Sequence, residues 1–262
     1  MPSCKICSSE SELFGEGTIL NKYNIKYYKC PNCGFLQTED PYWLEESYSD
    51  AINKSDVGYI HRNLILAKVT RQVILKFFDK KAKFIDYGTG YGIFVRLMRD
   101  YGFDFYGMDK YCEIIFAGDF TVSESDKGFE LLTAFELFEH LVEPLPEVEN
   151  MLRYSDSIFF STELFPSGNP KPGDWWYYGL DHGQHVAIYS KRSLEVIAEK
   201  FGLNLYTNGK NLHLLTKKKV SKLKFKFISY YNIYHSVKPF SSNKSLLDAD
   251  YKMIVKKIHS EK

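Results

Sequence analysis

The chain has 262 residues, of which 44% are hydrophobic and 26% are charged. This composition is typical of a globular protein with a sizeable core and excludes wholesale disorder. The 34 basic residues nearly balance the 33 acidic ones, which argues against a protein that mainly coats nucleic acid. The balance hides an asymmetry, however. Residues 217–262 hold twelve lysines and three acidic residues, a net charge of +9, which leaves −8 for the preceding residues.

The chain shows no signal for a membrane. No stretch approaches the roughly 18–20 consecutive apolar residues that a membrane-spanning helix needs. The N-terminus lacks the basic and apolar regions of a signal peptide. We therefore expect a cytoplasmic protein without a transmembrane segment.

Four of the five cysteines form two Cys-x2-Cys pairs that predict a metal site. The pairs are Cys4 with Cys7 and Cys30 with Cys33, and short strands are expected between them over residues 13–20 and 23–29. Two such pairs complete a tetrahedral site of four thiolates, which is typical of a structural zinc ribbon. Two disulfides or a redox-active motif are the alternatives, and a reducing cytosol makes disulfides less favourable.

Residues 58–78 have the apolar spacing of a helix. One buried stripe is expected from Ile60, Leu64, Val69, Val73 and Phe77. Beyond this helix, strand and helix patterns alternate, which predicts an α/β fold with a largely parallel, Rossmann-like sheet.

A glycine-rich loop follows the first strand of this region. The strand 83–86 ends at Asp86 and leads into Gly88, Gly90 and Gly92, after which a helix begins. Glycines let the backbone turn sharply and approach a ligand at the N-terminus of a helix. The next strand ends at Asp109, where an acid can accept hydrogen bonds from the ribose hydroxyls of a nucleoside.

This order of acid, glycines and second acid resembles the class I S-adenosylmethionine-dependent methyltransferases. The resemblance implies a seven-stranded, mostly parallel sheet with an antiparallel last strand, and S-adenosylmethionine as cofactor. In this chain, Asp119 would face the adenine amine and Phe120 the adenine ring. The expected cofactor-binding residues are Asp86, Gly88, Gly90, Gly92, Asp109, Asp119, Phe120 and Phe135. Only seven residues separate Asp109 from Ala117, so we expect that edge of the sheet to be abbreviated.

A narrower resemblance extends to residue 217. The cysteine ribbon, the segment Glu45–Tyr48 and the methyltransferase core together resemble nucleotide-sugar (deoxysugar) methyltransferases of surface-polysaccharide or natural-product pathways. The likeness implies a small-molecule acceptor that is nucleotide-linked, and O-methylation as the reaction. It also implies that His185, five residues before Ser190, lies near the acceptor.

Proton removal from an acceptor hydroxyl calls for a base, and histidine is the usual one. His185 is the first candidate, and His182 and His140 are its rivals; each could instead only hydrogen-bond a loop. The aromatic run around Trp175 could stack on a sugar or pack internally. The expected substrate-binding residues are Tyr48, Glu136, Trp175, Trp176 and Tyr178.

The chain is thus expected to divide into a zinc ribbon (1–45), a helical connector (46–80), a cofactor-binding core (81–217) and a basic C-terminal appendage (218–262). The appendage alternates lysine with apolar residues, then shows a short helical pattern over Leu246–His259. It is either a solvated amphipathic segment or a contact for an anionic partner, such as a membrane surface or a phosphorylated acceptor.

Two other functions remain open at this point. The chain could be a nucleic-acid or protein binding module with an inactive core, or an RNA or protein methyltransferase. The intact loop and its two acids argue against an inactive core, and the acidic charge of the first 216 residues argues against DNA as a partner.

Overall fold

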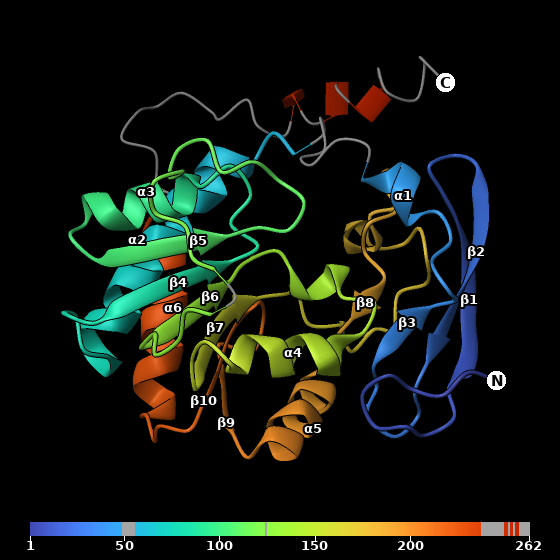
Figure 1. Cartoon of the computed structure of the whole chain (residues 1–262). Coiled ribbons are helices and arrows are strands. Elements are labelled where there is room, and N and C mark those ends of the chain that lie inside the picture. The colour runs from blue at the N-terminus through green and yellow to red at the C-terminus, as the bar shows by residue number, and fades with distance from the viewer. Residues whose placement is uncertain (49–55, 124, 237–248, 251, 254, 257–262) are drawn as a thin grey trace.

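The computed structural model of the chain describes residues 1–48, 56–123, 125–236, 249–250, 252–253 and 255–256. Two sheets lie side by side (Figure 1). A six-stranded sheet forms the centre of an α/β domain, and a four-stranded sheet contains the N-terminus.

The six-stranded sheet has the order β5-β4-β6-β7-β10-β9. Its strands are β4 (Lys83–Tyr87), β5 (Asp104–Met108), β6 (Leu131–Ala134), β7 (Ser157–Ser161), β9 (Asn204–Thr207) and β10 (Leu212–Thr216). β5, β4, β6 and β7 are parallel, whereas β10 runs antiparallel to both of its neighbours. The predicted α/β class is confirmed, with a mostly parallel sheet and an antiparallel last strand in the chain.

The edge beyond β5 is short. Among the described residues the sheet has six strands rather than the expected seven, and a single parallel bridge joins Gly107 of β5 to Thr121. The seven residues between Asp109 and Ala117 are too few for a helix and a full strand. Beyond β5, the chain therefore pairs with the sheet only at Thr121.

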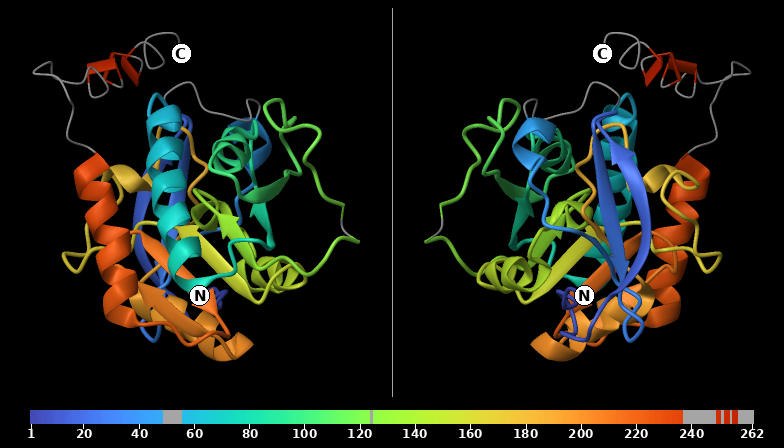
Figure 2. Two further views of the ribbon diagram at one scale, coloured as in Figure 1. Left: turned by 90° about the vertical axis from the view of Figure 1, so that its left-hand side faces the viewer. Right: turned by 90° about the vertical axis from the view of Figure 1, so that its right-hand side faces the viewer.

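Helices cover both faces of the central sheet (Figure 2). One face carries α2 (Tyr59–Phe77), α3 (Ile93–Asp100) and α6 (Lys222–Ser236); the other carries α4 (Pro144–Leu152) and α5 (Lys191–Phe201). Successive strand residues point to opposite faces, so Phe84 packs with the first group and Ile85 with the second. The remaining short helices are α1 (Leu44–Ser47), η1 (Phe138–His140) and η2 (Trp176–Tyr178).

The predicted helix is present in α2, but part of its expected buried stripe is wrong. Ile60 and Leu64 are 54% and 40% exposed. Val69 and Val73 are buried as expected, and the buried side continues through Leu66 rather than Leu64. The N-terminal half of α2 carries apolar side chains on more than one side, so spacing alone did not determine which side faces the sheet.

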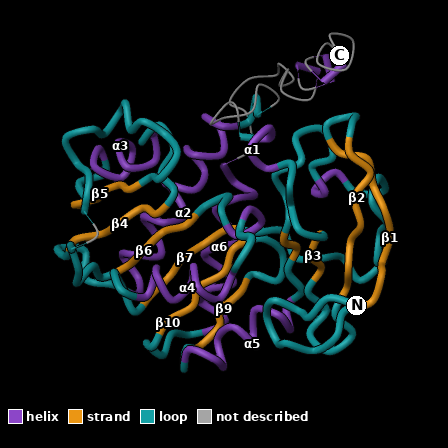
Figure 3. Tube along the Cα trace, turned by 45° about the vertical axis from the view of Figure 1, so that its right-hand side comes forward, coloured by secondary structure: helices purple, strands orange, loops and turns teal. Residues whose placement is uncertain are grey.

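The four-stranded sheet has the order β1-β2-β3-β8 and is visible beside the α/β domain in Figure 3. Its strands are β1 (Glu12–Ile19), β2 (Tyr23–Lys29), β3 (Leu36–Thr38) and β8 (Ala187–Ile188). The first two strands and the cysteine cluster are consistent with the expected small zinc ribbon. The last strand comes from far along the chain, between η2 and α5, so the ribbon is built into the α/β domain.

The start of the basic appendage is also part of the fold, because α6 packs against α2 and β9. The helical pattern expected over Leu246–His259 lies mostly outside the described residues. In the part of the chain that the structure describes, no helix is both long and apolar enough to cross a bilayer.

Candidate active site

The glycine-rich loop between β4 and α3 forms a tight backbone cradle. Gly88, Gly90 and Gly92 have φ values of +74°, +57° and +84°, a left-handed region that side chains disfavour. A Cβ at Gly90 would lie 3.1 Å from the Tyr59 hydroxyl, and one at Gly92 would lie 2.8 Å from a methyl group of Ile114. Both conformation and space therefore favour glycine, and the amides of Gly88, Gly90 and Gly92 hold the turn by donating to the Met108 carbonyl, the Asp109 carboxylate and the Thr89 carbonyl.

Asp109, at the end of β5, is tied to this loop. Its Oδ2 accepts a hydrogen bond of 2.8 Å from the amide of Gly90, and its Oδ1 accepts from the amides of Tyr111 and Cys112, each at 2.8 Å. The side chain is half-buried. The two predicted cofactor-binding elements, loop and second acid, are thus held together at the carboxyl end of the sheet.

Asp86 lies beneath the loop at the end of β4. It is 4% exposed, and its Oδ1 accepts a hydrogen bond of 2.6 Å from the Thr133 hydroxyl. Burial raises the pKa of Asp86 to about 7, while the bond from Thr133 opposes this shift. A cation placed at the loop would favour the ionised form of this carboxyl.

The residues expected to surround an adenine are less clearly arranged. Asp119 is exposed. The ring of Phe120 is covered on one side by the Arg99 guanidinium, 3.6 Å from the ring centroid. The ring of Phe135 packs edge-on against Phe94 and Phe159. Arg96 also lies over the Phe120 ring, 6.0 Å from its centroid, so two guanidinium groups already contact this ring.

The three candidate histidines, which come from two separate segments, lie together. The ring centroids of His140 and His185 are 5.0 Å apart, and those of His182 and His185 are 4.8 Å apart. His140 ends η1, just beyond β6, and the other two lie in the loop before β8. The Tyr48 hydroxyl is 2.7 Å from His140 Nδ1, so this predicted substrate-binding residue joins the same cluster.

Hydrogen bonds distinguish two of the histidines. His185 Nδ1 lies 2.6 Å from the carbonyl oxygen of Tyr177, and a carbonyl can only accept, so Nδ1 carries the proton and Nε2 keeps a lone pair. His182 is the reverse, because its Nδ1 accepts from the amide of Gln184 at 3.1 Å. In its neutral form, His182 therefore carries its proton on Nε2.

All three histidines are held neutral. Burial, together with the nearby His182 and Arg62, lowers the pKa of His140 to about 3. Burial also lowers the pKa of His185 well below its usual value, with His182 and His140 contributing. Burial likewise lowers the pKa of His182. Near neutral pH the three rings are therefore uncharged.

Glu139 belongs to this cluster, although the sequence reasoning did not select it. It is 1% exposed, and its Oε2 has no hydrogen-bond partner among the described residues. One donor atom from each of Glu139, His140 and His185 lies within 4.8 Å of the others. Burial raises the pKa of Glu139 to about 8, and the negative charge of Glu136 adds to the shift. The sequence signal was the Glu-His pair directly after a buried strand.

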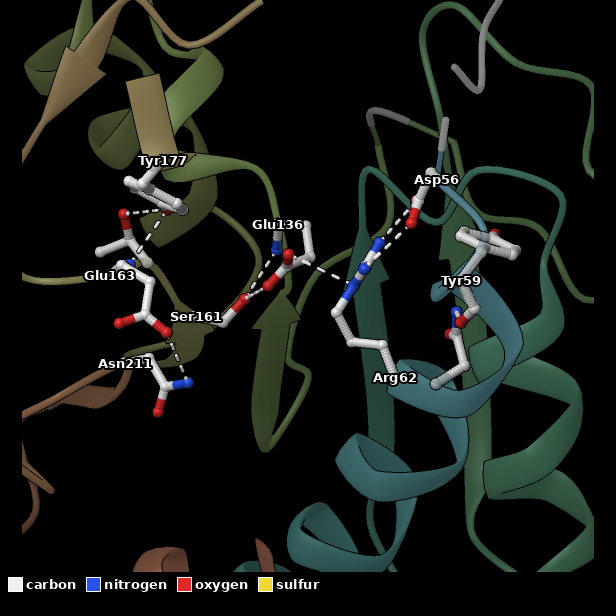
Figure 4. A network of polar contacts seen from close by, with 10 residues as sticks. Asp56, Tyr59, Arg62, Glu136, Ser161, Glu163, Tyr177 and Asn211 are labelled. Atoms are coloured by element: carbon white, nitrogen blue, oxygen red, sulfur yellow. Dashed lines mark hydrogen bonds and ion pairs between the residues drawn. The ribbon is translucent and has the colours of Figure 1, made fainter. Parts of the chain in front are cut away.

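Glu136 is the centre of a polar network at the end of β6 (Figure 4). Its backbone has φ +52°, which is unusual for a residue with a side chain. The conformation is held by Ser161, which receives a bond from the Glu136 amide and donates one to its Oε1 at 2.6 Å. The Arg62 guanidinium pairs with Glu136 Oε2 at 3.2 Å and with Asp56 at 2.6 Å. Strain of this kind is common at functional sites.

The aromatic run around η2 is divided between packing and exposure. Tyr178 is 1% exposed, its ring lies edge-on against Tyr27, and its hydroxyl donates to the carbonyl of Pro170. Its ring therefore forms part of the ribbon interior and not an open acceptor surface. Trp175 is half-buried, whereas Trp176 is 70% exposed.

The four ribbon cysteines form a compact cluster away from the histidines. One Sγ from each of Cys4, Cys7, Cys30 and Cys33 lies within 4.8 Å of the others, with no disulfide between them. The hydrogen bond between Cys4 and Cys33 lowers the pKa of the Cys4 thiol and raises that of Cys33. A closed set of four sulfur donors fits a structural zinc ion.

A sheet of this order, with a glycine-rich loop after one central strand and an acid after its neighbour, defines the class I methyltransferase fold. Residues 60–208 match the family described as "Methyltransferase domain". The chain therefore belongs to this family, and the expected class I S-adenosylmethionine-dependent methyltransferase domain is confirmed. Among curated proteins, none matches the chain.

One solved methyltransferase structure supports the fold, and two others are also similar to the chain. The plantazolicin methyltransferase in complex with SAH is 16% identical, with a TM-score of 0.51, and the match covers 75% of this chain and 89% of that one. Magnesium protoporphyrin IX methyltransferase from Synechocystis PCC 6803 with bound SAH is 14% identical (TM-score 0.46, 66% and 93% covered). An O-methyltransferase family protein from Burkholderia thailandensis is 10% identical (TM-score 0.49, 68% and 64% covered).

Proposed function

We propose that the chain transfers the methyl group of S-adenosylmethionine to a hydroxyl oxygen of a nucleotide-linked sugar or a related polysaccharide precursor. The observation that carries this proposal is the position of the histidine cluster. It follows β6 at the carboxyl end of the sheet, where the glycine loop after β4 also lies, and ligands of open α/β sheets bind at that end.

The loop and its acids fit the cofactor. Gly88, Gly90 and Gly92 leave a cradle that a Cβ would fill, Asp109 is placed for ribose hydroxyls, and Asp86 suits an ammonium group. When bound, S-adenosylmethionine supplies an electrophilic methyl group on a sulfonium. The chain itself must then orient the acceptor and take up its proton.

We assign the proton acceptor to His185. Its Nε2 lone pair is left free by the bond between Nδ1 and the Tyr177 carbonyl, whereas the lone pair of neutral His182 is already used by the Gln184 amide. As the acceptor oxygen forms its bond to the methyl carbon, its proton moves to His185 Nε2. The Glu139 carboxyl, with an oxygen within 4.8 Å of a His185 ring nitrogen, can then stabilise the imidazolium once it has released its own proton to solvent. His140 and Tyr48 form the adjacent wall.

The choice of a sugar acceptor is supported by the narrower sequence resemblance and by the site itself. The half-exposed carboxylate of Glu136 and the hydroxyl of Tyr48 can hydrogen-bond sugar hydroxyls, and the exposed Trp176 offers a ring face for stacking. The ribbon reaches the same loop, because Trp43 donates a bond of 2.7 Å to the carbonyl of Gly183.

Two measurements test the proposal in turn. Calorimetry should detect binding of S-adenosylhomocysteine, and this binding should be lost in Asp109→Ala. A panel of nucleotide sugars with labelled cofactor should then show transfer that falls about 10²–10⁴-fold in His185→Ala, while His61→Ala, in an exposed part of α2, keeps wild-type activity. Cofactor binding without transfer to any nucleotide sugar would refute the acceptor class. Absence of cofactor binding would refute the methyltransferase itself.

A further inference from the structure

Helix α6 is anchored to the domain by its inner side. The Phe225 side chain is fully buried. The centroid of its ring lies 6.1 Å from that of Phe159 and 6.3 Å from that of Tyr206. Ser229, one turn further on, is also buried and bonds back to the Phe225 carbonyl. The helix lies along α2 at the edge of the molecule (Figure 2), so its outer side is presented on a fixed support.

The outer side carries a stripe of large apolar residues. Leu223, Phe227 and Tyr230 are 81%, 65% and 51% exposed. Their spacing of four and three residues places them on one face of the helix. Together with Lys226 and the turn at Asn208–Gly209, they border a hollow of about 510 Å³. We call these three residues the α6 stripe.

Lysines flank the α6 stripe on both sides. At 100° per residue, Lys224 falls on one side of the stripe and Lys226 and Lys222 on the other. All three are exposed, and none makes an ion pair with an acid among the described residues. By contrast, Lys217 pairs with Asp156 and Lys218 with Glu130.

We propose that the α6 stripe and its flanking lysines dock on an anionic lipid surface. A bilayer with acidic headgroups offers apolar depth for Leu223 and Phe227 and negative charge for the lysines on one flat surface. Lysine stems can lie along the apolar layer while their amines reach the headgroups. Nucleic acid would satisfy the lysines but would leave Leu223, the most exposed of the three, without an apolar environment. The contact is interfacial, because no described helix can cross a bilayer.

The full chain is tested by sedimentation with vesicles. Vesicles of phosphatidylcholine alone are compared with vesicles that contain about one third phosphatidylglycerol, at low and at high salt. The wild type should bind the anionic vesicles at least tenfold better than the neutral ones, and high salt should weaken this binding because it screens the charges.

Matched variants locate the contact. Leu223→Ser with Phe227→Ser should reduce anionic-vesicle binding at least fivefold, while Leu13→Ser, at a 55% exposed leucine on β1, should not. Replacing Lys222, Lys224 and Lys226 with glutamine should also reduce binding to anionic vesicles at least fivefold. Replacing the exposed Lys26, Lys80 and Lys200 with glutamine changes the net charge equally and should have little effect. Unchanged thermal unfolding shows that each variant is folded.

Three outcomes would overturn the proposal. One is equal binding of wild type to neutral and anionic vesicles. Another is an equal loss in both lysine triple variants, which would make the effect one of net charge alone. The third is a concentration-dependent dimer that the Leu223→Ser, Phe227→Ser variant abolishes, because a second copy of the chain would then cover the α6 stripe. None of these measurements depends on methyl transfer.

Discussion

The Ser190 hydroxyl donates a hydrogen bond of 2.5 Å to the carbonyl of Cys33. The same oxygen accepts a bond from the Ser193 amide and caps the N-terminus of α5. One side chain thus joins the second cysteine pair to the helix that follows the loop of His182 and His185. Strand β8 lies between them and pairs with β3 of the ribbon.

This double role makes Ser190 a sensitive position. Ser190→Ala removes a helix cap, which costs about 1–2 kcal/mol of unfolding free energy, and it also frees the Cys33 carbonyl. Urea unfolding should show a lower midpoint with an unchanged slope. Ser167→Ala, in an exposed loop, is the control and should unfold like the wild type. Equal stability of the two variants would contradict the link.

Removing the metal that we propose for the ribbon should affect turnover more than cofactor binding. Cys7→Ser removes one of the four sulfur ligands. Without the metal, β3 is held less firmly, and β3 pairs with β8 next to the loop of His185. We expect about one zinc ion per chain to be lost, transfer to fall at least tenfold, and affinity for S-adenosylhomocysteine to change less than threefold. Cys112→Ser, at the cysteine outside the cluster, should change none of these. Full activity of metal-free protein would contradict the coupling.

Gly90→Ala should weaken cofactor binding specifically. A left-handed residue with a side chain costs about 1–2 kcal/mol, and its Cβ would press on the Tyr59 hydroxyl at 3.1 Å. We expect calorimetry to show at least tenfold weaker binding of S-adenosylhomocysteine. Gly102→Ala is the matched control, since Gly102 has φ +84° and a Cβ there would meet nothing within 4 Å. It should lose stability but keep affinity.

Arg62→Gln should destabilise the protein more than an exposed arginine substitution does. Arg62 is the shared partner of Asp56 and Glu136, and its side chain is one-third exposed, so about 1–2 kcal/mol is expected after screening. Arg96→Gln breaks the exposed pair with Asp100 and should cost less than about 0.5 kcal/mol. Chemical unfolding measures the stability of both variants. Similar losses of unfolding free energy would mean that the network in Figure 4 stabilises the protein no more than a surface ion pair does.

The sequence predicted the elements that depend on local pattern. The cysteine spacing, the glycine loop between strand and helix, and the alternation of strands with helices each have a short-range signal. Strands β3 and β8 were missed because they have only three and two residues and pair across about 150 positions. No local pattern reports such a pairing.

The site was predicted unevenly for a similar reason. The histidines were found by residue type, but their tautomers follow from the Tyr177 carbonyl and the Gln184 amide, which are backbone groups. Tyr178 was expected at the acceptor, but its ring packs against Tyr27 in the ribbon, a tertiary contact that the aromatic run itself does not report. Glu139 was missed because its raised pKa comes from burial, which residue type alone does not indicate.

Glu139 should make stability depend on pH. Burial raises its pKa from the ordinary 4.5 to about 8, so between these values the folded protein binds a proton that the unfolded chain releases. Stability from this group therefore falls as pH rises through that window. Glu139→Gln keeps a neutral side chain, so its unfolding free energy relative to wild type should increase from pH 5 to pH 8 and then level off. Glu113→Gln, at an exposed position, should show a constant difference. Urea unfolding at pH 5, 7 and 9 measures this, and a pH-independent effect of Glu139→Gln would mean that the carboxyl ionises as it does in water.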